Sequence, residues 1–556
     1  MKSDSDFSGR QPPSNILESL EDALPRSIRY CCLLLTLATS NAIAQNWPQG
    51  SGPNGNWSID AADPPTSWSA STGRNVLWRT KMPESGQGTA VVWGDRLFVT
   101  SNVPWGRDQE PARSGKRSGP MGTDIDGYCL DANSGRILWK VRLPGSRLKL
   151  YAGPFSDSTC PSPVTDGERV WFYNVSGMIG CYDFDGNEIW THSWTPRGLM
   201  ANRQFEPLLV DDVILNIEVL DKSTVIDKRA LVDDAVVKKL KQEHGNRNYF
   251  TYIHAYDKLT GKLKWVSEDP TSTHSASCLG TTSDGQLALL HGRGGGHHPI
   301  EEPKGLSLTS LAPGNEGRTL WRYEINTGSE YSHQWNSRYA TWWIKGHHVV
   351  LDASTGEVVR KQPLTTSVSI RDFDPATDMY VDSQQDTLNP GNKVTTHYSN
   401  LLFGDHHYFR TYGPFFIGRV HLETGKTEYL RVPIQVVHEN GEGRRLIWDK
   451  RKVIPNDTRN SRGIDVGVAD KRSKGNGWGH ISAAPPTRVG NILYIPTMIG
   501  TTYVIDTTAD RLDEKSLLSV SDLGPPGKTW TLGTFSFANG RLYHRTMKEV
   551  ICIGAR

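Results

Sequence analysis

Histidine, tryptophan and basic residues recur in segments that lead into short apolar runs of this chain. An imidazole can ligate a metal, transfer protons or bind a ligand, and an indole offers an apolar face with one hydrogen-bond donor. A guanidinium or ammonium group can pair with an anion. The candidate ligand-binding residues are Arg203, His274, His333, Trp335, His397, His480, Lys528 and Trp530.

The spacing of the four histidines limits this hypothesis. Counted to the next turn glycine along the chain, they lie at unequal distances from Gly285, Gly346, Gly404 and Gly490. They are therefore expected on a common face but not at a common depth. Unrelated loop histidines are the alternative interpretation.

A second group of metal-ligand types flanks the glycine-rich run 292–296. These residue types ligate divalent metals, but their spacing fits no compact template, so a flexible loop is the alternative. The weak metal candidates are His291, His297 and His298, with Glu301 and Glu302 next to them. No nucleophile motif is found, and no catalytic residue is predicted.

The candidate residues lie between or within the copies of a repeated sequence unit, which must therefore determine their positions. Its cleanest copy, 255–265, places Asp257 and Gly261 in a tight turn and ends on Trp265, which can fill the gap between two neighbouring sheets. Most copies follow a hairpin signal, so the unit is strand, turn, strand, loop, strand, turn, strand, which is one β-propeller blade. The structural repeat tryptophans are Trp78, Trp139, Trp190, Trp265 and Trp321.

The two ends of the chain predict a closed ring. The last blade, 534–556, lacks a fourth strand, and 72–82 reads as a fourth strand with no partners before it. Pairing them would remove the exposed edges of an open array. The sequence therefore predicts an all-β, eight-bladed propeller of four-stranded antiparallel blades, with seven blades as the alternative, because 339–352 leaves little room for a fifth blade.

Residues 1–44 have the features of an export signal: Arg26 and Arg29, a short apolar run at 30–39, and a small-x-small pattern ending at Ala44. An N-terminal extension (45–71) and one propeller domain (72–556) follow. The domain is expected to carry insertions, namely a surface loop at 104–124, a short amphipathic helix within 221–249, a polar linker at 371–396 and a solvated basic stretch at 436–479.

Composition narrows the partner classes. The formal net charge of +2 argues against a dedicated nucleic-acid binder, and no apolar run is long enough to span a membrane. A periplasmic or secreted, monomeric bacterial protein is expected. After Ala44 five cysteines remain, too few for a disulfide framework in a chain of this size.

The copy at 255–265, with Trp47-Pro48 and the run 52–55, resembles the quinoprotein-type (PQQ-like) β-propeller repeat family, as in secreted bacterial members. The resemblance covers nearly the whole chain after Ala44 and implies the fold. It also implies an alternative function, a PQQ- and calcium-dependent dehydrogenase of alcohols or sugars. Enzymes of that family carry adjacent cysteines above the cofactor and acidic and amide calcium ligands, and neither set is matched after Ala44.

The preferred hypothesis is therefore a non-catalytic binding or assembly propeller that is exported from the cytoplasm. Its protein or carbohydrate partner would bind the axial loop face, and no cofactor is predicted. This role is similar in type to that of the propeller lipoprotein of the outer-membrane β-barrel assembly machinery.

Overall fold

The computed structural model describes residues 45–555 except 104–123, 146–158, 195–205, 220–250, 273, 296–300, 326–331, 345, 384–386, 389–394, 412–414, 440–442, 456, 458 and 460–483. In these ranges the chain forms strands and one short 3-10 helix, η1 (Lys450–Lys452). None of the helical structure there has the length and apolar character needed to cross a lipid bilayer. The predicted export signal, most of the 104–124 loop and the 221–249 helix lie outside the described residues.

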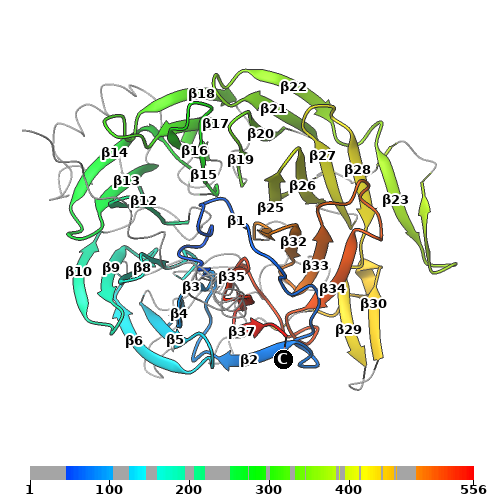
Figure 1. Ribbon diagram of the computed structural model, residues 1–556, viewed down its shortest axis with the longest axis horizontal. Coiled ribbons are helices and arrows are strands. Elements are labelled where there is room, and N and C mark those ends of the chain that lie inside the picture. Colours follow the sequence, from blue (N-terminus) through cyan, green and yellow to red (C-terminus); the bar gives the residue numbers. More distant parts are fainter. Residues whose placement is uncertain are drawn as a thin grey trace, which may run out of the picture. The chain divides into compact units, whose positions relative to one another are not determined.

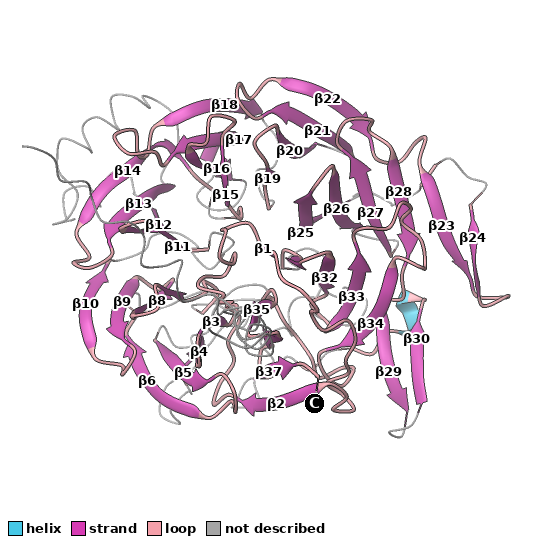
Figure 2. Ribbon diagram, viewed as in Figure 1, coloured by secondary structure: helices cyan, strands magenta, loops and turns pink. Residues whose placement is uncertain are grey.

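Eight sheets, or blades, follow one another around a ring (Figures 1 and 2). Blade 1 is β3 (Val91–Trp93), β4 (Arg96–Asn102), β5 (Ile125–Asp131) and β6 (Ile137–Leu143); blade 2 is β7 (Val164–Thr165), β8 (Arg169–Asn174), β9 (Met178–Asp183) and β10 (Glu188–Ser193); blade 3 is β11 (Leu208–Val210), β12 (Val213–Val219), β13 (Thr251–Asp257) and β14 (Leu263–Pro270); blade 4 is β15 (Cys278–Thr281), β16 (Leu287–Gly295), β17 (Glu301–Ser310) and β18 (Thr319–Ile325). Blade 5 is β19 (Gln334–Trp335), β20 (Tyr339–Ile344), β21 (His347–Asp352) and β22 (Val358–Pro363); blade 6 is β25 (Thr395–Phe403), β26 (His406–Thr411), β27 (Phe416–His421) and β28 (Thr427–Arg431); blade 7 is β31 (Thr487–Val489), β32 (Ile492–Pro496), β33 (Thr501–Asp506) and β34 (Leu517–Asp522); blade 8 is β35 (Ser536–Ala538), β36 (Arg541–Arg545), β37 (Glu549–Ile553) and β2 (Val76–Lys81).

Blade 8 closes the ring as predicted. β2 pairs antiparallel with β37, and Trp78 lies opposite Cys552. The eight-bladed prediction is confirmed, and the seven-bladed alternative is wrong. The fifth blade has its four strands because β20 and β21 are joined by a very tight connection between Ile344 and His347.

The repeat tryptophans join consecutive blades. Trp190 of blade 2 donates its indole N–H to the Lys258 carbonyl of blade 3 at 2.9 Å, and its ring covers Gly261. A Cβ at Gly261 would lie 2.6 Å from that ring, and the glycine has a φ of 68°, a conformation that other residues rarely adopt. The rings of the four other tryptophans cover the turn glycines of the next blade in the same way: Trp78 over Gly135, Trp139 over Gly186, Trp265 over Gly317 and Trp321 over Gly356.

The N-terminal extension, which precedes β2, lies inside the ring. Its strand β1 (Ser58–Ile59) occupies the centre of Figure 1. Trp47 exchanges backbone hydrogen bonds with Val92 of blade 1 at 2.8 and 2.9 Å. The side-chain oxygen of Gln49 accepts from the Leu209 N–H of blade 3 at 2.8 Å. β1 then pairs in parallel with β31 of blade 7. One short segment thus ties distant blades together.

Two insertions form hairpins where none was predicted. The expected polar linker 371–396 begins with β23 (Ser369–Asp374) and β24 (Met379–Asp382), and β23 pairs in parallel with β28. The expected solvated stretch 436–479 begins with β29 (Gln435–Glu439) and β30 (Gly443–Ile447). Charged and polar residues in these segments favoured a linker or a solvated stretch over strands, although β23 sets apolar Ile370 and Phe373 among charged residues, and β29 contains the buried pair Val436 and Val437.

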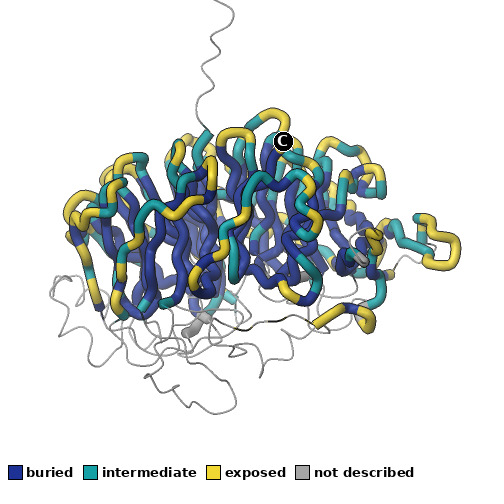
Figure 3. The backbone as a smooth tube through the Cα atoms, turned by 90° about the horizontal axis from the view of Figure 1, so that it is seen from below, coloured by how far each residue is buried: buried dark blue, intermediate teal, exposed yellow. Residues whose placement is uncertain are grey.

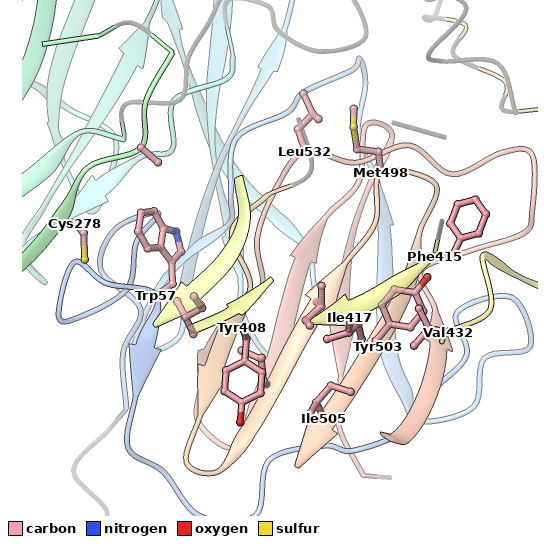
Figure 4. Packing of buried hydrophobic residues seen from close by; sticks show 14 of the residues in the cluster. Trp57, Cys278, Tyr408, Phe415, Ile417, Val432, Met498, Tyr503, Ile505 and Leu532 are labelled. Atoms are coloured by element: carbon pink, nitrogen blue, oxygen red, sulfur yellow. The ribbon is translucent and has the colours of Figure 1, made fainter. Parts of the chain in front are cut away.

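Each blade buries both of its faces against its neighbours. Seen edge-on, the buried strands run between exposed turns (Figure 3). The largest apolar cluster spans blades 4 to 8 and includes Trp57 of the central segment together with Cys278 and Tyr408 (Figure 4). Trp57 has a φ of 58°, which is unusual for a bulky residue. Its N–H donates to the Ser51 carbonyl at 2.6 Å, and its carbonyl accepts from the Arg488 N–H at 2.9 Å, which holds this conformation.

Candidate functional site

The two faces of the ring differ in their connections. First-to-second and third-to-fourth strand connections form one face and are mostly tight turns, such as the one in which Asp257 accepts from the Thr260 N–H at 2.8 Å. The other face carries second-to-third and fourth-to-first connections, which include the longest in the propeller: those between Val219 and Thr251, between Pro363 and Thr395, and between Arg431 and Thr487. We call this second side the loop face.

Four hydroxyl groups and one carboxylate join the inner-strand starts of five consecutive blades near the loop face. The chain of contacts runs from Thr487 Oγ1 to Thr534 Oγ1 (2.7 Å), from the Thr534 N–H to Thr89 Oγ1 (3.1 Å), and from the Thr89 N–H to Ser162 Oγ (3.0 Å). The Ser162 N–H then donates to Glu206 Oε2 at 2.8 Å. These groups satisfy one another, so they rigidify the axial rim.

Three of the predicted ligand-binding residues support the framework. The ring of His333 stacks on Trp342 with centroids 5.1 Å apart and an interplanar angle of 4°. Trp335 donates its indole N–H to the Cys278 carbonyl at 2.9 Å, which joins blade 5 to blade 4. Trp530 is buried in the large apolar cluster.

Of the other predicted positions, two are described by the structure and three have side chains outside the described residues. His274 is buried, and its carbonyl accepts from the Tyr398 hydroxyl at 2.5 Å, while Lys528 is exposed. The described contacts do not gather these candidates into one site. Arg203 and His480, and the side chain of His397, lie outside the described residues.

The weak metal hypothesis finds no support at His291. This side chain is fully buried, its Nε2 lies 2.8 Å from Thr309 Oγ1, and burial lowers its pKa to about 4. It is a neutral, hydrogen-bonded core histidine. His297 and His298 lie outside the described residues.

Sequence reasoning missed a buried acid–base group between blades 2 and 3. The Tyr256 hydroxyl donates to Glu218 Oε1, and His192 Nε2 lies 3.5 Å from the same oxygen and 3.3 Å from the Tyr256 hydroxyl. Trp194 stacks on the His192 ring with centroids 5.5 Å apart. Glu218, Tyr256 and His192 lie on three different strands, β12, β13 and β10, so no local spacing connected them in the sequence.

A second missed group fills the joint between blades 5 and 6. His348 Nε2 lies 3.0 Å from His407 Nδ1, and His407 Nε2 lies 2.9 Å from Asn400 Oδ1. Since the Asn400 oxygen only accepts, His407 Nε2 donates to it, its Nδ1 accepts, and His348 Nε2 donates. Burial lowers the pKa of His348 to about 3 and that of His407 well below its usual value, so both rings are neutral.

The cysteines do not support redox chemistry. All five described cysteines are buried free thiols, and burial raises the pKa of Cys129, Cys181, Cys278 and Cys552 to about 12. They behave as small apolar residues. In the part of the chain that the structure describes, no three His, Cys, Asp or Glu side chains are grouped to hold a metal, so the calcium ligands that the resemblance implies cannot be assigned there.

Comparison with known proteins gives a family match. The family model described as outer membrane protein assembly factor BamB matches residues 66–229 and 128–341. No curated protein sequence matches the chain.

Several solved structures are similar at low identity. A quinohemoprotein alcohol dehydrogenase from Pseudomonas putida HK5 is 11% identical, with 92% of this chain and 81% of that chain covered and a TM-score of 0.47. The enzyme from Comamonas testosteroni is 12% identical over 93% and 82%, with a TM-score of 0.47. BamB from Moraxella catarrhalis is 11% identical over 86% and 99%, with a TM-score of 0.32. At these values the likenesses carry no argument about function.

The repeated Asp-turn and tryptophan units, the closed ring of eight four-stranded blades and the family model agree with one another. The chain belongs to the PQQ-like β-propeller repeat family.

Proposed function

We propose that the protein is a non-catalytic binding or assembly propeller that acts outside the cytoplasm, with its partner bound on the loop face. The difference between the two faces carries the proposal. Tight turns close one face, whereas the long connections leave from the other, and loops on a rigid scaffold are where binding residues concentrate. The hydroxyl–hydroxyl and backbone–hydroxyl contacts between the inner-strand starts supply such a scaffold.

The described titratable groups favour binding over catalysis. Glu218 and His407 are buried within the joints between blades, and their described partners are other framework residues. A catalytic acid or base must reach its substrate within hydrogen-bond distance. These groups therefore stabilise the ring rather than face a reactant.

The test compares the two faces. One variant replaces residues 221–249 with a short Gly-Ser linker, and the matched control, Lys258→Glu with Lys262→Glu, changes the turn face only. Partners are captured from an envelope extract of the host, identified, purified and titrated calorimetrically against each form. We expect the loop variant to lose affinity by about tenfold or more while the control keeps it.

Two results would overturn the proposal. One is equal loss of affinity in both variants. The other is a cofactor absorbance change, together with dye-linked oxidation of an alcohol or sugar, after the purified protein is loaded with pyrroloquinoline quinone and calcium.

A further inference from the structure

The hairpin β23–β24 extends blade 6 beyond the ring. Blade 6 thereby becomes a six-stranded sheet with β24 at its end (Figure 2). The hairpin sits in a fixed position, because the Phe373 ring stacks on Trp448 at 3.8 Å and 6°, and Arg371 binds both carboxylate oxygens of Glu514 at 2.6 and 2.8 Å. A sheet edge that is held rigidly is prepared for pairing with another strand.

Among the described residues, no strand pairs with the outer edge of β24. Ser383 donates its N–H to the Ile370 carbonyl, so the pairs Asp372–Val381 and Asp374–Met379 are the hydrogen-bonded ones in this antiparallel ladder. The backbone N–H and C=O groups of Tyr380 and Asp382 therefore point outward. Such an edge can accept a further strand through backbone hydrogen bonds.

The side chains of the hairpin divide between two faces. Phe373 and Tyr380 face Trp448, and Asp382 faces Arg511. Met379 and Val381 lie on the opposite side and are 59% and 40% exposed. Met379 is the most exposed large apolar residue among those described.

Carboxylates surround these two apolar residues. Asp372 and Asp374 lie opposite Val381 and Met379 in the ladder, and Asp378 lies in the turn. None of the three has an ion-pair partner within 4.0 Å among the described residues. The strip is thus apolar at its centre and acidic around it.

We propose that the outer edge of β24 is a docking strip for an extended basic segment of a partner protein, which adds to blade 6 as a further strand. Its backbone would bond to Tyr380 and Asp382, its apolar side chains would cover Met379 and Val381, and its lysine or arginine residues would pair with Asp372, Asp374 and Asp378. A second copy of this chain does not fit, because two acidic strips would repel each other. The strip lies in the connection between blades 5 and 6, a different segment from residues 221–249, so the peptide assay and the loop-replacement test can fail independently of each other.

The probe is a fluorescein-labelled (Lys-Lys-Val-Val)2 peptide, whose two faces both alternate lysine with valine, and its control is (Glu-Glu-Val-Val)2. Binding to the full chain is followed by fluorescence anisotropy. We expect binding of the basic peptide alone. Val381→Lys should weaken it by about tenfold, because an edge lysine blocks pairing. Asp372→Asn with Asp378→Asn should weaken it by about fivefold and reduce its salt dependence.

The matched control is Val359→Lys on β22, since Val359 is 57% exposed on the outer strand of blade 5. It should leave binding unchanged, and circular dichroism should show that every variant is folded. The proposal is overturned if the basic peptide does not bind, if Val359→Lys weakens binding as much as Val381→Lys, or if sedimentation shows a dimer of this chain that Val381→Lys abolishes.

Discussion

Two regions of the ring hold their blades together differently. From blade 8 through blade 5, every joint is a tryptophan over a turn glycine, and four of the five indoles donate a hydrogen bond to the next blade. From blade 5 through blade 8 no joint has this pair. At the first of these joints Gln362 donates to the Gly425 carbonyl in place of a tryptophan.

The second region is held by added segments instead. The hairpin β23–β24 reaches from blade 6 to Glu514 of blade 7, and β29–β30 is held by His438, whose Nε2 lies 3.1 Å from Asp522 Oδ2. The segment before β2 packs Trp68 against Tyr494 and Phe535. The comparison shows that one fold can be closed by repeated local joints or by individual long-range contacts, and only the first kind repeats in sequence.

The largest expected effect is the loss of one tryptophan joint. Trp190→Ala should lower the free energy of unfolding by about 3–5 kcal/mol, because it removes a buried ring and a hydrogen bond and leaves a cavity. Gln362→Ala, at the corresponding joint of the other region, should cost about 1 kcal/mol. Urea unfolding of the full chain measures both, and equal losses would remove the distinction between the two regions.

Acid should weaken the joint between blades 5 and 6. The pKa of His348 is about 3 in the folded chain against 6.5 unfolded, so below pH 6.5 the unfolded chain binds more protons and stability is lost as the pH falls. At pH 5 this histidine alone should cost about 2 kcal/mol. The double variant His348→Leu with His407→Leu should show a shallower decline of the unfolding free energy between pH 6.5 and 5. An unchanged slope would contradict this.

An effect of comparable size is expected from the turn glycines. Gly261→Ala should cost about 2–3 kcal/mol, since the added Cβ meets both a positive φ and the Trp190 ring. Gly540→Ala is the matched control, because Gly540 has a φ of 73° with no atom within 4 Å of an added Cβ, and it should cost about 1 kcal/mol. Thermal unfolding separates the two values, and identical shifts would show that the ring contact adds nothing.

The smallest effect is expected at the Arg371–Glu514 pair. Glu514→Gln should change the unfolding free energy by at most about 1 kcal/mol, because both side chains are partly exposed and water screens the pair. Hydrogen exchange in β23 should nevertheless become faster, since the pair anchors that hairpin. A decrease in the unfolding free energy as large as that of Trp190→Ala would mean that individual long-range contacts and repeated tryptophan joints stabilise the ring equally.

Much of the fold could be predicted from the sequence, because each blade is specified by turns and strand alternation within short segments. The turn of Asp257, Thr260 and Gly261 is built within five residues, and strand alternation and the position of Trp190 follow from it. Ring closure was predictable from the incomplete units at the two ends. The hairpin β23–β24 was not, because its polar strands become half-buried only where β28 and Trp448 already lie beside them.

The candidate site shows where local reasoning ends. Residue types at 274, 333, 335 and 530 suggested a ligand site, yet whether an imidazole or indole faces a ligand or the next blade depends on the twist and spacing of whole sheets. The tertiary structure buried His333 on Trp342 and joined Glu218 to Tyr256 and His192 from strands far apart in the chain. The sequence alone thus determined the blade, its repetition and its closure, since these depend on short-range turns and alternation. Only the packing of blade against blade decided which polar groups meet, because that is set by contacts between residues that no local pattern connects.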